Sequence, residues 1–265
     1  MGVRALAFCW SILACAFSFA QAPQIGQVSK DSVWVPTPER VIRRMLQMAD
    51  TTKDDVVIDL GSGDGRIPIY AAKHFGARGI GVELEQNLVE ISRKAARAQG
   101  VAHLAEFHQM DLFKADLSKA TVVALYISPS VMTRLKPVLL DLKPGTRVVS
   151  HYFKLDDWEP DESIVVEDRT AHLWLVPARV EGRWVVNDDF RMNIDRDFQK
   201  IGITGERDGR AINIIGARLR GTEIRFTSFD RNGDVRHYTG RVEGARMSGT
   251  SDGDGKPWVA TRIAP

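Results

Sequence analysis

The chain has 265 residues, with 36 Lys and Arg against 34 Asp and Glu. This length allows one large domain or two modest ones. The near balance of charge disfavours nucleic-acid binding, because attraction to phosphate normally dominates that affinity. Both cysteines, Cys9 and Cys15, lie close to the start of the chain, so C-x-x-C metal and redox sites are excluded from the remainder.

Residues 1–22 are typical of a signal peptide. Arg4 supplies the positive charge, Ala5–Ala20 the apolar stretch, and Ala20–Ala22 a cleavage signal of the A-x-A kind. We therefore expect cleavage after Ala22 and a periplasmic or secreted protein. A lipobox cysteine at Cys15 and an uncleaved membrane anchor stay open as alternatives, although the apolar stretch is short for a membrane span.

The first helix of the mature chain is predicted over residues 39–49. Thr37 and Pro38 stand directly before it. A threonine followed by proline is typical of a helix N-cap and a first helical position.

The most informative segment is Val56–Leu60 (VVIDL), which runs directly into a glycine-rich turn. Its apolar and mostly β-branched residues suit a strand that is buried on both faces of a parallel sheet. Gly61, Gly63 and Gly65 let the backbone bend sharply and leave room for a ligand. The pattern indicates a cofactor site.

Strands and helices alternate from this point to residue 153. Further strands are predicted over residues 79–83, 106–112, 122–127 and 147–153, with helices over 67–75, 87–99 and 131–140. Each connection is long enough for a crossover, so the pattern implies a parallel sheet with helices on both faces. In such sheets the ligand lies at the carboxyl ends of the strands, where the glycine turn, Glu83 and Asp111 are found.

The turn fits one nucleotide-binding pattern better than another. A dinucleotide turn reads G-x-G-x-x-G, and its third glycine allows close packing of helix on strand. Arg66 occupies that third position here. The run Asp59–Gly65 (DLGSGDG) instead resembles motif I of the class I S-adenosylmethionine-dependent methyltransferases. The resemblance implies a transferase, S-adenosyl-L-methionine as cofactor, and an α/β fold with a doubly wound, mostly parallel Rossmann-like sheet.

The resemblance also implies roles for individual residues. Glu83 would accept both ribose hydroxyls, because a carboxylate offers two oxygens and no donors, and Asp111 would accept from the adenine amino group. Thr37 would reach the methionyl end of the cofactor. A helix N-cap or an ordinary surface acid is the alternative for Glu83, and a helix N-cap is the alternative for Thr37. The predicted cofactor site consists of Thr37, Asp59, Gly61, Ser62, Gly63, Asp64, Gly65, Glu83, Asp111 and Leu112.

Flanking segments narrow the resemblance over residues 31–160. Val33–Pro38, Leu125–Met132 and Trp158–Pro160 are similar to the ATP synthase c-subunit lysine methyltransferase subgroup. This similarity implies a protein amine, a lysine, as methyl acceptor. The N-P-P-Y segment that holds planar amino groups in other members is missing, so methylation of adenine, cytosine or a glutamine amide is disfavoured. Candidate residues of the acceptor cleft are Tyr126, Ser128 and Pro129, with a core position as the alternative for Tyr126.

Two other functions stay open, a small-molecule methyltransferase and a non-catalytic protein that keeps the nucleoside pocket. Methyl transfer from a sulfonium requires alignment and exclusion of water, so no metal site is predicted. The partner is expected to be a protein or a small molecule and not a nucleic acid, with membrane proximity possible and the oligomeric state open. Export conflicts with a cofactor that is made in the cytosol.

After residue 161 the pattern changes to short alternating runs separated by glycine-containing turns. This is the signature of repeated hairpins, and it predicts a separate β-rich accessory domain over residues 162–265, a meander or small barrel. Trp174, Trp184 and Trp258 are expected in its core. Asp252–Gly255 (DGDG) is interpreted as a hairpin turn, because it lacks the later carboxylates of a calcium loop.

Overall fold

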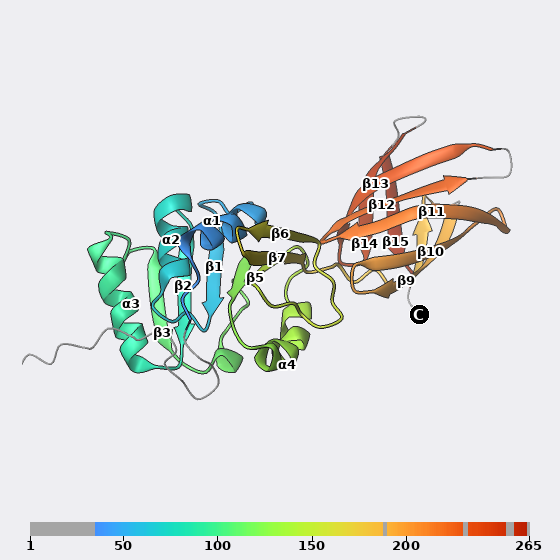
Figure 1. Ribbon diagram of the computed structural model, residues 1–265. Helices are drawn as coiled ribbons and strands as arrows, with labels where there is room; N and C mark the ends of the chain where they lie inside the picture. Colours follow the sequence, from blue (N-terminus) through green and yellow to red (C-terminus); the bar gives the residue numbers. More distant parts are fainter. Residues whose placement is uncertain (1–34, 188–189, 230–232, 253–256, 264–265) are drawn as a thin grey trace, which may run out of the picture.

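The computed structural model describes residues 35–187, 190–229, 233–252 and 257–263. The predicted signal peptide and part of the Asp252–Gly255 turn lie outside the described residues. The chain forms a seven-stranded sheet with helices and a closed β-barrel (Figure 1). Among the residues described, no helix is both long and apolar enough to cross a membrane.

The seven-stranded sheet has the order β3-β2-β1-β4-β5-β7-β6. Its strands are β1 (Val56–Leu60), β2 (Arg78–Glu83), β3 (Ala105–Gln109), β4 (Val122–Leu125), β5 (Arg147–His151), β6 (Glu162–Val166) and β7 (Arg169–Leu175). Its helices are α1 (Glu39–Met48), α2 (Arg66–Phe75), α3 (Gln86–Ala98) and α4 (Pro129–Leu140), with a 3-10 turn η1 (Leu112–Lys114). Strands β1 to β5 are parallel. The strand order reverses between β1 and β4, which confirms the predicted doubly wound, mostly parallel sheet.

Helices cover both faces of the sheet because successive residues of its buried strands point to opposite sides. Val57 and Val122 pack with α1 and α2 on one face. Ile58 and Val123 pack with α4 on the other. Helix α3 packs with α2 over Phe107 of β3. Packing on both faces holds the strands in place, and with them the turn that follows β1.

The second part of the chain is a closed antiparallel barrel (Figure 1). Its strands are β8 (Gly182–Val186), β9 (Phe190–Asp197), β10 (Lys200–Arg207), β11 (Arg210–Arg220), β12 (Glu223–Phe229), β13 (Val235–Glu243), β14 (Arg246–Ser251) and β15 (Pro257–Arg262). Aromatic side chains fill the interior: the rings of Phe226 and Tyr238 stack at 4.6 Å between centroids, and Trp184 and Trp258 are buried with them. The predicted small barrel is confirmed.

The strand pairing divides the chain later than the expected boundary at residue 162. Strand β7 pairs antiparallel with β5, and β6 pairs with β7, so both strands extend the first sheet and the barrel begins at Gly182. Trp174, expected in the β domain, is buried in the core beneath α4. The alternating pattern of these residues marks antiparallel strands but does not determine which sheet they join, because that depends on a distant partner strand.

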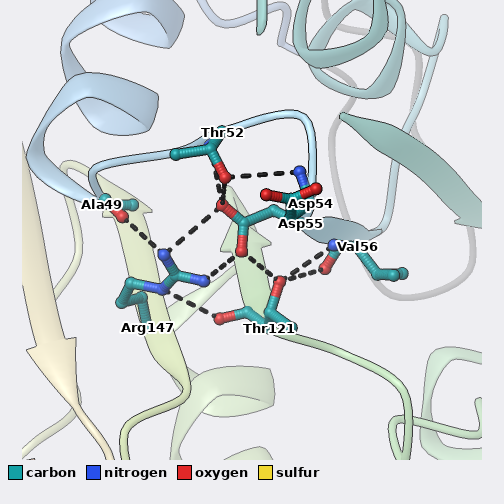
Figure 2. A network of polar contacts seen from close by, with 7 residues as sticks. All are labelled: Ala49, Thr52, Asp54, Asp55, Val56, Thr121 and Arg147. Atoms are coloured by element: carbon teal, nitrogen blue, oxygen red, sulfur yellow. Dashed lines mark hydrogen bonds and ion pairs between the residues drawn. The ribbon is translucent and has the colours of Figure 1, made fainter. Parts of the chain in front are cut away.

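A polar network joins four segments at the amino ends of the strands (Figure 2). Asp55, buried just before β1, accepts hydrogen bonds from the backbone N–H of Thr52 and the hydroxyl of Thr121, both at 2.7 Å, and forms an ion pair with Arg147. Arg147 also donates to the carbonyl of Ala49 at 3.0 Å. The network ties the end of α1 to β1, β4 and β5, far from the carboxyl ends of these strands.

Asp55→Asn is expected to lower the free energy of unfolding by about 3 kcal/mol at pH 7, because it leaves Arg147 without its charged partner. Burial raises the pKa of Asp55, but hydrogen bonds from Arg147, Thr52 and Thr121 outweigh it and the net pKa is lowered. The stabilisation is therefore present above the pKa of the unfolded chain, about 3.9, and is lost as the pH falls through the folded value.

Urea unfolding at pH 7 and pH 3 measures this effect. The difference between wild type and variant should shrink at the lower pH, whereas exposed Asp54→Asn, the control, should have little effect at either pH. A pH-independent difference would show that the charge of Asp55 does not carry the stabilisation.

Candidate functional site

The carboxyl ends of β1, β2 and β4 surround an open pocket with about 990 Å³ of empty space, its mouth included. Its walls include ten residues that the sequence singled out, namely Thr37, Asp59, Gly61, Ser62, Gly63, Asp64, Glu83, Asp111, Leu112 and Tyr126. The predicted candidates Gly65, Ser128 and Pro129 are not in the walls.

The glycine turn after β1 is bound to the end of β2. The backbone N–H groups of Gly61 and Ser62 both donate to the carbonyl of Val82 at 2.9 Å. Gly61, Gly63 and Gly65 have φ of 81°, 54° and 77°, in the left-handed region where a Cβ is strained. The turn is therefore attached to the end of β2, and Gly61, Ser62 and Gly63 line the pocket.

Gly65 lies behind the pocket and has a packing role. A Cβ at Gly65 would lie 2.5 Å from the Phe107 ring and 2.7 Å from Ser92. Ser92, fully buried on α3, donates to the carbonyl of Gly63 at 3.1 Å. Glycine at position 65 thus allows α3 and β3 to pack closely against the turn. The motif I pattern alone does not show whether a glycine is needed for such packing or for contact with a ligand.

Glu83 ends β2 with its carboxylate held by backbone donors. The N–H of Gly63 donates to Oε2 at 2.8 Å, and the N–H groups of Leu84 and Glu85 donate to Oε1 at 2.8 and 3.0 Å. Each carboxylate oxygen accepts about two hydrogen bonds, so Oε2 retains capacity toward the pocket. Glu83 therefore both caps the chain after β2 and presents an acceptor to the pocket, as a ribose ligand requires.

Asp111 follows β3 and caps η1, where its Oδ1 accepts from the N–H of Phe113 at 2.9 Å. The predicted strand ends earlier, at Gln109, so Asp111 and Leu112 lie in a turn. The second carboxylate oxygen is available for an amino group.

Asp64 is fixed by Arg66, a residue that sequence reasoning missed as part of the site. The guanidinium binds both oxygens of Asp64, at 2.6 Å for Nη2 to Oδ2 and 2.9 Å for Nε to Oδ1. Its Nη1 donates to the carbonyl of Thr37 at 3.0 Å. Arg66 thus joins the segment before α1 to the glycine turn. In the sequence, the position of Arg66 after Gly65 indicated only that the turn is not a dinucleotide-binding turn.

Thr37 does not cap α1, although the sequence pattern favoured that alternative. The carbonyl of Pro38 accepts from the N–H groups of Val41 and Ile42, and Pro38 is the N-cap residue without a side-chain cap. The Thr37 hydroxyl instead lies 3.2 Å from Nδ1 of His151. His151, at the end of β5, is a second residue that the sequence did not identify, because its contact with Thr37 spans 114 positions.

The acceptor candidates separate in the structure. Tyr126 is half-buried in the pocket wall and its ring lies 4.1 Å from the His151 ring, so a purely core position is wrong for it. Ser128 is the N-cap residue of α4 and contacts the hydroxyl of Ser130 at 3.2 Å. Pro129 is exposed at the first position of that helix. Ser128 and Pro129 therefore shape the start of α4 beyond the pocket wall.

The pocket is strongly acidic on one side. Asp59 is 3% exposed, and burial together with the charges of Glu83 and Asp64 raises its pKa well above its usual range. An acidic cluster of this kind favours a cationic ligand, because a positive charge offsets both the desolvation and the repulsion.

Asp59→Asn is expected to stabilise the ligand-free protein at pH 8 and to weaken S-adenosylmethionine binding. The folded pKa is raised, so ionisation of Asp59 destabilises the fold as the pH rises through that value. Asparagine removes this charge but also an attraction for the sulfonium. Urea unfolding at pH 5 and 8 and calorimetric titration measure the two effects, with exposed Asp54→Asn as control. A variant less stable than wild type at pH 8 would contradict the assigned charge repulsion.

The residues of the pocket fit S-adenosylmethionine. Carboxylates suit its sulfonium, its ammonium and its ribose, and the glycine backbone leaves space for close approach. The doubly wound sheet, the turn after β1 and the acid at the end of β2 define an S-adenosylmethionine-dependent methyltransferase.

Comparisons with known proteins agree with this class. The ANTKMT methyltransferase domain family matches residues 59–162. A protein-lysine N-methyltransferase of Saccharolobus islandicus (strain REY15A) is 44% identical over 149 residues, which cover 54% of this chain and 92% of that protein. The ATP synthase c-subunit lysine N-methyltransferase of Caenorhabditis elegans is 31% identical over 62% of this chain and 86% of that protein. The chain therefore belongs to this family of S-adenosylmethionine-dependent methyltransferases.

A solved structure is similar as well. It is titled an RNA methyltransferase from Salinibacter ruber in complex with S-adenosyl-L-homocysteine, with 52% identity, a TM-score of 0.54, and coverage of 55% of this chain and 96% of that one. The predicted cofactor is confirmed. By contrast, the chain spans only 56% of the Xenopus laevis ATP synthase c-subunit lysine N-methyltransferase, at 36% identity.

Proposed function

We propose that the protein transfers a methyl group from S-adenosylmethionine to the side-chain amine of a lysine in a protein. The observation that carries this proposal is the 44% identity to a protein-lysine N-methyltransferase over 92% of that protein's length. The ATP synthase c-subunit enzymes of Xenopus laevis and Caenorhabditis elegans support it at lower identity.

The pocket walls suit an amine acceptor. When bound, the cofactor would supply an electrophilic methyl group. A neutral amine nitrogen would gain the N–CH₃ bond as the S–CH₃ bond breaks, and the methylammonium group formed would then release its proton to bulk solvent. Tyr126, Ile127 and Val131 form an apolar part of the wall. An apolar wall lowers the pKa of a lysine amine, because desolvation disfavours the ammonium form. The wall thereby favours the neutral nucleophile and excludes water.

RNA is the second candidate acceptor, because the Salinibacter structure at 52% identity is titled an RNA methyltransferase. The near-balanced charge of this chain argues against it, since phosphate contacts supply most of the affinity for nucleic acid.

One experiment separates the acceptors. The purified protein is incubated with methyl-labelled S-adenosylmethionine and, separately, with envelope proteins or total RNA. Labelled methyl-lysine after hydrolysis of the proteins is the expected result. Label found in nucleosides alone would show that the methyl acceptor is RNA and not a lysine side chain. Absence of label from both, with S-adenosylhomocysteine binding intact by calorimetry, would favour a small-molecule acceptor or a non-catalytic role.

We also propose that residues 1–22 direct export and that the barrel is an accessory domain. The charge, apolar stretch and A-x-A site of the leader support export. Cell fractionation with N-terminal sequencing should find the chain outside the cytosol and beginning at Pro23, directly after the cleavage site. A cytosolic protein that retains Met1 would contradict export and remove the conflict with cofactor supply.

A further inference from the structure

His151 is a buried histidine that the proposed chemistry does not use. It ends β5 with 0% exposure, and its ring packs 4.1 Å from the Tyr126 ring at an interplanar angle of 37°. Its Nδ1 lies 3.2 Å from the Thr37 hydroxyl. Its Nε2 is buried without a hydrogen-bond partner among the described residues. The side chain thus makes one polar contact within the described part of the chain, and this contact reaches a wall of the cofactor pocket.

Thr37 is held from both sides. Its backbone carbonyl accepts from Arg66, and its hydroxyl meets His151. Thr37 is 3% exposed and lines the pocket. Because Pro38 provides the N-cap of α1, the Thr37 hydroxyl has no role in starting that helix. Its orientation depends on the imidazole.

His151 is neutral at physiological pH. Burial, with a smaller contribution from the charge of Arg169, lowers its pKa to about 4. A fully buried imidazole with so low a pKa is too weak a base to take a proton from an incoming ammonium group, so a general-base role is disfavoured. The remaining question is which ring nitrogen carries the proton.

The surroundings favour the proton on Nδ1. Among backbone groups, a buried N–H without an acceptor is rarer than a buried C=O without a donor, and we extend the same preference to the imidazole. With the proton on Nδ1, the imidazole donates to the Thr37 oxygen and Nε2 keeps only a lone pair. The Thr37 hydroxyl has a single hydrogen, and this hydrogen is then directed away from His151 toward the pocket.

We infer that His151 is a positioning residue that makes the Thr37 hydroxyl a donor to the carboxylate of the cofactor's methionyl group. Asp59, Asp64 and Glu83 make the adjoining wall negative, so the carboxylate of the ligand is repelled from them and requires donors elsewhere. Thr37 lines the α1 side of the pocket, and the positively charged Arg66 lies beside it, donating to the Thr37 carbonyl. The inference rests on the cofactor and is independent of the lysine acceptor.

The test uses two ligands that differ at the methionyl end. S-adenosylhomocysteine has the amino-acid group, whereas 5′-methylthioadenosine has the same nucleoside without it. Calorimetric titration of the full protein measures the affinity of each variant. Thr37→Val and His151→Phe should each lower the affinity for S-adenosylhomocysteine by about 10-fold, which corresponds to about 1.4 kcal/mol. The affinity of both variants for methylthioadenosine should stay within about twofold of the wild-type affinity. The double variant should be no weaker than Thr37→Val, because both changes remove one interaction.

Conservative variants separate positioning from packing. His151→Asn keeps a side-chain N–H donor and should retain more affinity for S-adenosylhomocysteine than His151→Phe, and Thr37→Ser should resemble wild type. Thermal unfolding monitors whether each variant is folded. Equal loss for both ligands, an unchanged His151→Phe, or additive losses in the double variant would each overturn the inference.

Discussion

Glu83→Gln is expected to weaken the binding of S-adenosylhomocysteine by about 100-fold or more. The amide has the shape of the carboxylate but replaces one oxygen by an NH₂ group. That group must face either the N–H of Gly63 or the N–H groups of Leu84 and Glu85, so either orientation opposes donors to donors. Hydrogen bonds to a charged group contribute about 1.5–3 kcal/mol each, and loss of one such bond and of a ribose contact reaches the expected factor.

The pattern across ligands identifies the role of Glu83. Methylthioadenosine carries the same ribose, so Glu83→Gln should weaken it as much as S-adenosylhomocysteine, unlike the Thr37 and His151 variants. Glu90→Gln, which changes an exposed acid on α3, is the matched control. If calorimetric titration found near-normal affinity in Glu83→Gln, the ribose assignment would be contradicted. Glu83 would then have only its structural role, as the acceptor for backbone N–H groups after β2.

Gly65→Ala is expected to lower the free energy of unfolding of the methyltransferase domain by about 4 kcal/mol. The left-handed φ of 77° costs about 1–2 kcal/mol for a residue with a Cβ. The added methyl group would also lie 2.5 Å from Phe107 and 2.7 Å from Ser92, and such overpacking costs about 1–3 kcal/mol. Both neighbours are buried, so neither can move aside without disturbing α3 or β3.

Gly100→Ala is the matched control for this change. Gly100 has a φ of 73°, and a Cβ there would meet nothing within 4 Å among the described residues, so only the backbone cost of about 1–2 kcal/mol is expected. Urea unfolding followed by tryptophan fluorescence measures both variants. Equal destabilisation of the two would show that the contacts with Phe107 and Ser92 relax freely.

The sequence predicted the parts of this protein that depend on short segments. Asp59 to Gly65 specify the turn through their own backbone preferences, and Glu83 follows a strand that is apolar enough to recognise alone. Contacts between segments that are distant in the sequence could not be predicted from these short patterns. Nothing near Thr37 indicates that its hydroxyl meets His151, because the pairing arises only when β5 joins the sheet beside β4.

The same limit explains the late start of the barrel. Residues 162–175 alternate as the barrel strands do, and local pattern specifies which face of a strand is buried but not its neighbour. The position of β7 is decided by its pairing with β5 and by burial of Trp174 against Trp158, whose carbonyl accepts from the Trp174 indole at 2.8 Å.

Closure of the barrel has a consequence for self-association. Strand β15 pairs with β8, which closes the eight strands into a barrel, although β11 pairs with β10 only at Arg210 to Ile212. Closure shortens the unpaired strand edges, where chains add to one another and aggregate. The seven-stranded sheet ends instead in β3 and β6. Val165 on β6 is 73% exposed, on a short strand that carries Glu162 at its start. Fibre-like association of the folded protein, where it occurs, should therefore begin at β6, and Val165→Lys should suppress it.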